Sequence, residues 1–289
     1  MLSGEPVLIV EGQERRLAPL GALRGAVVGS PAMKRMARVI GLVCLVAALL
    51  APAAIAADRY VALGDSFSSG VGTGSYTLSS SCRRGVYAYP WLVAQQRPET
   101  SLTFVACSGA KTSDLMATQI GYVAADTTIV SLTIGGNDIG FSDLIVQCTL
   151  ADCSAALDNT RASLRTVLAP RLDTVYSSIR SRALGAAVIV LGYPRIFSTA
   201  GCFGTLGISS TERAKANLLS DALNALSSER AGLANVTYKS AIVPFTGHAV
   251  CSSSAWLNGL NLFNTVESYH PNRNGNSLGY APLVRAVVG

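Results

Sequence analysis

Short apolar runs alternate along the chain with longer amphipathic segments. The runs are nearly continuous and rich in β-branched residues, which is typical of strands that are buried on both faces of a parallel sheet. They lie at residues 59–63, 102–106, 128–134, 186–192 and 236–243. This pattern predicts five buried strands.

Helical periodicity separates these runs. One predicted helix covers residues 158–184 and has a buried face with a spacing of three and four: Leu164, Val167, Leu168, Leu172, Val175 and Ile179. Pro170 interrupts it, so we expect a kink or two helices. A second helix should begin at residues 210–212 and bury Ala216, Leu218, Leu219, Leu223 and Leu226. Strands that alternate with helices predict crossover units and a three-layer α/β domain.

The N-terminal part has the layout of a secretory signal peptide. Residues 33–38 (MKRMAR) are basic, residues 39–50 are uncharged and apolar, and residues 54–56 (AIA) form a small-x-small cleavage site. The apolar run is shorter than a membrane span, which needs about 20 residues, so a membrane anchor is the weaker alternative. We expect residues 33–56 to be the signal peptide. Residues 1–32 are then upstream sequence from a start codon assigned too early, or a long natural leader.

Removing this leader changes both the length and the net charge of the expected mature protein. Residues 57–289 make 233 of the 289 residues, enough for the single domain that we expect. Residues 1–56 hold six of the 23 Lys and Arg and three of the 17 Asp and Glu, which reduces the net charge from +6 to +3. The basic residues do not cluster as they do in nucleic-acid-binding proteins, so we expect no nucleic-acid partner.

The cysteine count points to an oxidising compartment. Cys44 lies inside the leader, and six of the seven cysteines remain after its removal: Cys82, Cys107, Cys148, Cys153, Cys202 and Cys251. An even number behind a signal peptide predicts disulfides. Several pairings are compatible with the sequence, and we favour pairs of sequential neighbours. A metal site is disfavoured because the sequence has no Cys-x-x-Cys pair and no His cluster.

Ser66 is a candidate nucleophile. It lies in GDSFS at residues 64–68, directly after the first predicted strand, and binding crevices of open α/β sheets lie at the carboxyl ends of strands. A helix N-cap is the structural alternative, since Asp65, Ser66 and Ser68 are all good caps. The motif is not the Gly-x-Ser-x-Gly elbow of the α/β-hydrolase fold, because Ser68 replaces the second glycine.

Two further positions could stabilise an oxyanion. Asn137, in GGND at residues 135–138, follows the third predicted strand, and its amide N–H₂ could point at a developing negative charge. A turn is the alternative, since this sequence is typical of turns. Gly109, which follows the second predicted strand, could add a backbone N–H or be an ordinary loop glycine.

His270 is the candidate general base. It is one of only two histidines in the chain, and a serine nucleophile needs a base with a pKa near the working pH. Pro271 restricts the backbone at His270 to an extended or turn form. Glu267 is the favoured partner for the His270 ring, and a local carbonyl such as that of Ser268 is the alternative. The other histidine, His248, has no such surroundings and is expected to be structural.

The four motifs GDSFSSG, ACSGAKT, IGGND and YHPN resemble those of the SGNH, or GDSL-type, hydrolase superfamily. The marker residues would be Ser66, Gly109, Asn137 and His270. The resemblance runs from Arg59 to the C-terminus, and its details are similar to the secreted lipases and esterases of Streptomyces-type actinobacteria. The chain departs from the family pattern in two ways: Phe67 follows the nucleophile where Leu is usual, and Glu267 stands where Asp is usual.

The resemblance implies a fold and a chemistry. The fold would be a three-layer α/β/α sandwich around a central, mainly parallel five-stranded sheet. The resemblance also implies three disulfides: Cys82–Cys107, Cys148–Cys153 and Cys202–Cys251. The reaction would be ester hydrolysis through an acyl-enzyme, without metal or cofactor. Ser66 and His270 would be catalytic with Glu267, and Ser66, Gly109 and Asn137 would form the oxyanion hole.

The expected function is therefore a secreted serine ester hydrolase, a lipase or esterase, that acts as a monomer and meets lipid surfaces transiently. Phospholipase A1 and carbohydrate acetylesterase are the enzymatic alternatives. A secreted binding module without turnover is the alternative from a different class. Trp91, Phe141, Trp256 and Phe263 are candidates for an acyl groove, although core packing is the default expectation for large aromatic side chains.

Overall fold

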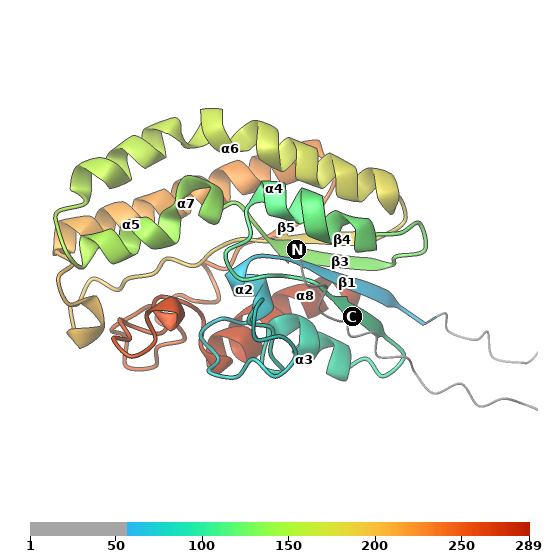
Figure 1. The fold of residues 1–289 in the computed structure, drawn as a ribbon, viewed down its shortest axis with the longest axis horizontal. Helices are drawn as coiled ribbons and strands as arrows, with labels where there is room; N and C mark the ends of the chain where they lie inside the picture. Colours follow the sequence, from blue (N-terminus) through green and yellow to red (C-terminus); the bar gives the residue numbers. More distant parts are fainter. Residues whose placement is uncertain (1–56) are drawn as a thin grey trace, which may run out of the picture. The chain divides into compact units, whose positions relative to one another are not determined.

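The computed structural model describes residues 57–289 (Figure 1). Five strands form one sheet in the order β2-β1-β3-β4-β5, and every neighbouring pair is parallel. The strands are β1 (Arg59–Gly64), β2 (Ser101–Phe104), β3 (Ile129–Thr133), β4 (Ala187–Leu191) and β5 (Thr237–Lys239). Each overlaps one of the five predicted runs, with β1 and β2 shifted by one or two residues at an end. Strand β5 is shorter than residues 236–243 because only these three residues pair with β4.

Helices cover both faces of the sheet, which confirms the three-layer architecture. In Figure 1, α4, α6 and α7 lie on one side, and α2, α3 and α8 lie on the other. The helices are α2 (Ser66–Ser69), α3 (Tyr89–Gln95), α4 (Thr112–Asp114), α5 (Phe141–Cys148), α6 (Ser154–Arg182), α7 (Ser210–Leu233) and α8 (Ala281–Val288). Single 3-10 or π turns occur at Leu115–Gln119, Ile120–Tyr122, Asn137–Ile139, Phe203–Thr205, Thr265–Glu267 and Gly275–Tyr280.

The two long helices differ from expectation in detail. Pro170 does not divide α6, which is one curved helix (Figure 1), because the ring lies on the exposed face, where water can bind the carbonyl that loses its partner. Helix α7 begins at Ser210, as predicted, with Ser209 as N-cap and Glu212 completing a capping box. Leu218, which was expected on the buried face, is 50% exposed.

The strand order creates the crevice. The chain leaves β1 toward β2 on one side and later returns to β3 on the other side, so the order reverses between β1 and β3. A ligand crevice is expected outside the carboxyl ends of the strands at such a switch point. The register pairs Gly64 with Thr133, so β1 and β3 end at the same level. The segments that follow these two strands carry Ser66 and Asn137.

The structure contains the three disulfides in the predicted sequential pairs: Cys82–Cys107, Cys148–Cys153 and Cys202–Cys251. Across residues 57–289, no helix is long and apolar enough to cross a membrane. The predicted signal peptide and the boundaries at residues 32 and 56 lie outside the described residues and stay predictions.

Candidate active site

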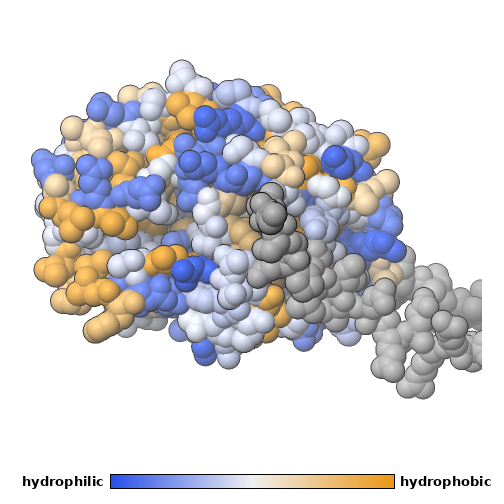
Figure 2. Space-filling model, in the orientation of Figure 1, coloured by the Kyte–Doolittle hydropathy of each residue, from blue (hydrophilic) through white to orange (hydrophobic). Residues whose placement is uncertain are grey.

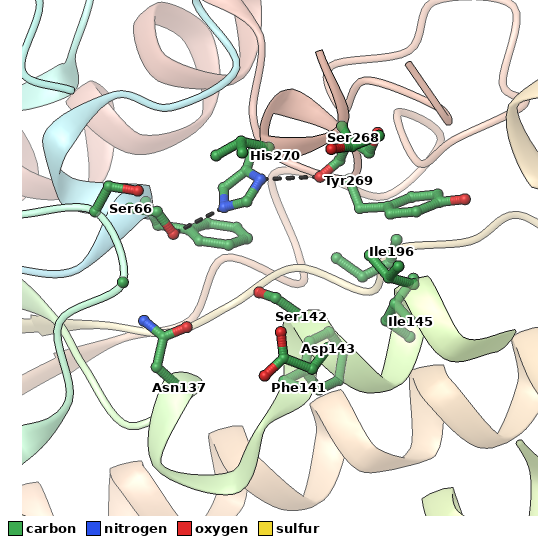
Figure 3. A pocket seen from close by; sticks show the side chains of 16 residues that line it. Ser66, Asn137, Phe141, Ser142, Asp143, Ile145, Ile196, Ser268, Tyr269 and His270 are labelled. Carbon is green, nitrogen blue, oxygen red and sulfur yellow. Dashed lines mark hydrogen bonds between the residues drawn. The ribbon is translucent and has the colours of Figure 1, made fainter. Parts of the chain in front are cut away.

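Ser66 is the first residue of α2, at the carboxyl end of β1. The turn before it requires glycine, because Gly64 has φ +120° and a Cβ there would lie 2.4 Å from the carbonyl oxygen of Thr133. Asp65 is the helix N-cap, and its carboxylate accepts a hydrogen bond from the Phe67 N–H at 3.0 Å. The capping interpretation of this motif is therefore correct for Asp65, while Ser66 faces the pocket, where a nucleophile would have to lie (Figure 3).

A buried hydrogen-bond cluster fixes this turn against β3 and the loop after it. The Asp65 carboxylate accepts from the Thr133 hydroxyl at 2.6 Å and from the Tyr193 hydroxyl. The same Tyr193 oxygen accepts from the Gly136 N–H at 3.2 Å, next to Asn137. Burial raises the pKa of Asp65 to about 6, although the hydrogen bonds that its carboxylate accepts act in the opposite direction. The cluster thus links the serine turn to the asparagine turn.

Asn137 and Gly109 come together beside Ser66, and all three line one pocket. The Asn137 side-chain N–H₂ donates one hydrogen bond to the Ala110 carbonyl at 3.0 Å, which leaves its second N–H for a ligand. Gly109 has φ +82°, and a Cβ there would meet no atom within 4 Å. Within residues 57–289, the backbone N–H groups of Ser66 and Gly109 have no hydrogen-bond acceptor. The pocket is thus lined by three N–H donors that a ligand oxygen could accept from.

His270 lies against Ser66 although 204 positions separate them in sequence. Its Nε2 is 2.8 Å from the Ser66 hydroxyl oxygen, and its Nδ1 is 2.9 Å from the carbonyl oxygen of Ser268 (Figure 3). A carbonyl can only accept, so Nδ1 carries the proton and Nε2 accepts from the Ser66 hydroxyl. This is the tautomer that a general base for serine requires.

The favoured contact between Glu267 and His270 does not form in the structure. Glu267 ends the 3-10 turn Thr265–Glu267, and its carboxylate accepts a hydrogen bond from the Tyr76 hydroxyl at 2.6 Å. The backbone turns after it, with Tyr269 at φ +62°, and this turn directs the Ser268 carbonyl toward the imidazole. The alternative partner considered from the sequence, a local carbonyl, is therefore the one observed.

The electrostatics keep His270 neutral. Burial lowers the pKa of His270 to about 4, the hydrogen bond to the Ser268 carbonyl raises it in part, and the positive charge of Arg83 lowers it further. A neutral imidazole at neutral pH can accept the serine proton at once. The ring also packs against Phe67, with the ring centroids 5.1 Å apart.

The pocket beside these groups has a volume of about 270 Å³ and is mostly apolar on the side away from Ser66. Figure 3 shows Ile145, Ile196 and Tyr269 together at that far side. Phe141, Val146 and Val266 complete its apolar lining. Such a lining fits an acyl chain whose carbonyl reaches Ser66.

The sequence pointed to the polar groups that meet in this pocket but gave no sign of most of its apolar lining. Ile145 and Ile196 give no signal beyond ordinary apolar residues, and Tyr193 could not be linked to Asp65 from the sequence. Of the proposed aromatic candidates, Phe141 lines the pocket, while Phe263 is 103% exposed and neither packs in the core nor lines this pocket. The second histidine, His248, stacks on Trp256 with ring centroids 3.7 Å apart, as a structural residue would.

One cluster among residues 57–289 has donor atoms close enough to hold a metal ion: Cys148, Cys153 and Glu212. The two sulfur atoms are joined in a disulfide and cannot act as thiolates. One Glu212 oxygen accepts from the Cys153 N–H at 2.8 Å, which explains the position of this carboxylate next to the disulfide. This arrangement is therefore a structural contact.

Comparison with known proteins agrees with the fold and identifies the family. The model of the GDSL-like Lipase/Acylhydrolase family matches residues 62–278. Lipase 1 of Streptomyces coelicolor is 43% identical over 239 residues, which cover 81% of this chain and 88% of that protein. The crystal structure of an extracellular lipase from Streptomyces rimosus has a TM-score of 0.76 and 42% identity, with 80% of this chain and 100% of that chain covered. Phospholipase A1 from Streptomyces albidoflavus gives a TM-score of 0.76 and 43% identity over the same shares.

A parallel α/β/α sandwich with a serine, an imidazole and unpaired N–H donors at its switch point is the arrangement expected of a hydrolase that acts on acyl groups. The chain belongs to the GDSL-like lipase/acylhydrolase family and is a carboxylic ester hydrolase.

Proposed function

We propose that this protein hydrolyses acyl esters through an acyl-enzyme on Ser66. His270 Nε2 takes the proton of the Ser66 hydroxyl while the oxygen attacks the ester carbonyl. The proton passes from His270 to the leaving alcohol as the ester C–O bond breaks. Water, deprotonated by the same imidazole, then releases the acid from Ser66.

The observation that carries this proposal is the pair of hydrogen bonds on His270. One ring nitrogen meets the Ser66 hydroxyl at 2.8 Å and the other meets the Ser268 carbonyl at 2.9 Å. The Ser268 carbonyl thus has the orienting role that we expected of Glu267. The oxyanion would be held by the backbone N–H groups of Ser66 and Gly109 and by the Asn137 amide.

The substrate class follows from the pocket. An apolar cavity of about 270 Å³ is larger than an acetyl group needs, so we propose medium or long acyl chains, as in lipases and phospholipases, over carbohydrate acetates. The similarity to lipases and to a phospholipase A1 supports this choice. Secretion is proposed from the leader pattern, the three disulfides and the extracellular relative. We further propose a monomer that contacts lipid surfaces transiently.

Ser66→Ala tests the proposal. The variant should lose the burst of alcohol release and the covalent labelling by an organophosphonate, and its turnover of p-nitrophenyl esters should fall by at least about 10⁴-fold. Ser181→Ala, on the exposed surface of α6, is the matched control and should keep full activity. Near-normal turnover by Ser66→Ala would reject the mechanism.

A substrate panel tests the proposed class. Rates on p-nitrophenyl esters from acetyl to palmitoyl should rise beyond acetyl because longer chains fill the apolar lining, and phosphatidylcholine should be cleaved. A preference for acetylated xylan would instead favour a carbohydrate esterase. Binding of any of these compounds without turnover would indicate a binding module.

A further inference from the structure

Arg83 lies beside the oxyanion loop, outside the groups assigned so far. Its neighbour Cys82 is bonded to Cys107, with the two Cα atoms 4.2 Å apart, and the Cys82 carbonyl accepts from the Ser108 N–H at 3.0 Å. Ser108 and Gly109 line the pocket. The disulfide therefore holds Arg83 next to the segment that carries an oxyanion donor.

A second set of contacts places the Arg83 side chain near His270, at the entrance of the pocket. Its guanidinium carbon is 5.6 Å from the centroid of the Tyr76 ring. The Tyr76 hydroxyl accepts from the Gly72 N–H at 3.2 Å, and a Cβ added to Gly72 would lie only 2.9 Å from the Cβ of His270. The effect of the Arg83 charge on the pKa of His270 agrees with this proximity.

The Arg83 cation has no carboxylate partner within residues 57–289. Other arginines of the protein pair with acids, such as Arg171 with Asp138 at 3.1 Å and Arg195 with Asp221 at 2.7 Å. Glu267 is the acid on the other side of Tyr76, and its Oε1 accepts from the Tyr76 hydroxyl. Arg83 is half-buried, so its charge is both accessible to a ligand and held near the site.

The backbone at Arg83 is held in an unusual conformation. Its φ is +52°, in the left-handed region that costs a residue other than glycine about 1–2 kcal/mol. The turn is closed by the Arg84 N–H, which donates to the Ser79 carbonyl at 2.9 Å, and by the Cys82–Cys107 disulfide. The loop therefore fixes where this side chain leaves the backbone.

The orientation of the ester in the pocket determines which part of the substrate lies next to Arg83. The acyl chain occupies the apolar side of the pocket, around Ile145 and Ile196 (Figure 3). The leaving oxygen must face His270 Nε2, because it takes its proton from that atom. The alcohol part of the substrate therefore leaves the pocket on the side of His270, where Arg83 lies.

We propose that Arg83 forms a subsite for the phosphate of a glycerophospholipid, on the alcohol side of the scissile ester. Guanidinium presents paired N–H donors that match phosphate oxygens, and the phosphate lies only a few bonds from the ester in such a lipid. This inference rests on the proposed function and specifies its substrate. Arg83 acts there as a specificity determinant and takes no part in the bond-breaking steps.

The test compares two substrates with identical acyl chains, dihexanoylphosphatidic acid and dihexanoylglycerol, each kept below its aggregation limit. Arg83→Gln should lower kcat/KM for the phosphate-bearing substrate by about tenfold or more, because a charge-assisted contact is lost. It should leave kcat/KM for dihexanoylglycerol within about twofold. Arg83→Lys should keep part of the preference. Arg182→Gln removes the same charge at the exposed end of α6, away from the carboxyl ends of the strands, and should change neither rate.

A second measurement needs no variant. The preference of the unaltered protein for the phosphate-bearing substrate should shrink as NaCl is raised, since salt screens a half-exposed charge pair. An equal loss on both substrates in Arg83→Gln, no loss on either, or a preference that does not respond to salt would overturn the proposal. Failure to cleave either substrate by the unaltered protein would instead reject the proposed function.

Discussion

The two halves of the active site are held in place by different means. Ser66 and Asn137 follow β1 and β3, whose backbones are paired along their length. His270 comes from residues 241–272, which contain isolated bridges and one 3-10 turn but no paired strand. A few specific contacts hold that segment, including the hydrogen bond from the Asn258 N–H to the His270 carbonyl at 2.9 Å. The sheet half thus depends on repeated local geometry, and the loop half depends on individual tertiary contacts.

This difference has a consequence for the surface of the molecule. Among the exposed large apolar residues, Phe203, Leu206, Leu262, Phe263 and Val266 belong to the loop-rich segments around residues 203–206 and 262–266. Figure 2 shows apolar atoms gathered at one end of the visible face. The loop half, which carries His270, thus also carries a group of exposed apolar side chains, whereas α6 and α7 lie over the sheet half (Figure 1).

Asn137→Ala probes the sheet half most directly. Removing one oxyanion donor should lower kcat by about 10²–10³-fold with little change in KM, because the lost hydrogen bond forms with the transition state. Steady-state kinetics on a soluble p-nitrophenyl ester measure this effect. Asn159→Ala, on the exposed surface of α6, serves as the control. If kcat falls by less than about fivefold in Asn137→Ala, the asparagine has only a structural role in the turn.

The pH dependence of stability should distinguish the two halves by its sign. The folded-state pKa of His270, about 4, lies below the ordinary value of 6.5, so its contribution is present above about pH 6.5 and is lost as the pH falls through 4. The folded-state pKa of Asp65, about 6, lies above the ordinary value of 3.8, so its contribution is present below about pH 3.8 and is lost as the pH rises through 6. Each shift corresponds to about 3 kcal/mol.

These opposed slopes should nearly cancel between about pH 4 and 6 in the unaltered protein. His270→Gln should then lose stability as the pH rises over this range, and Asp65→Asn should gain it. Urea unfolding at a series of pH values measures both slopes. If the free energy of unfolding changes with pH in the same direction in both variants, the opposite pKa shifts of His270 and Asp65 are contradicted.

The disulfides allow a comparison of the restraints on each half. Cys202–Cys251 joins residues 49 apart and ties down the segment that leads to His270, while Cys148–Cys153 joins residues 5 apart after α5. Replacing each pair by serines should cost about 4 kcal/mol for the first and about 2 kcal/mol for the second, because the longer loop gains more unfolded-state entropy. Urea unfolding gives both values. A larger loss from the shorter loop would show that native contacts outweigh loop entropy.

Glu267→Gln should have the smallest effect. The carboxylate binds Tyr76, and the Ser268 carbonyl already orients the imidazole, so kcat should fall by less than about tenfold. Kinetics on the same ester, beside Asn137→Ala, give a direct ranking of the two halves. A loss of several orders of magnitude would mean that Glu267 turns to His270 during the reaction.

The sequence determined the regular half of this protein. Continuous apolar runs predict the buried strands. The turn into α2 requires glycine at residue 64, since no other residue tolerates the close approach to Thr133. The motifs around Ser66, Gly109, Asn137 and His270 identified the groups that the fold brings together. The cysteine order likewise matched the observed pairs.

Tertiary structure decided the rest. A few backbone torsions at Ser268 and Tyr269 direct a carbonyl toward His270 and send the Glu267 carboxylate to Tyr76. The sequence allowed either the Glu267 carboxylate or the Ser268 carbonyl as the partner of His270, and only the folded loop distinguishes them. The apolar pocket around Ile145 and Ile196 and the position of Arg83 also depend on contacts between distant segments, which no local pattern of residues encodes.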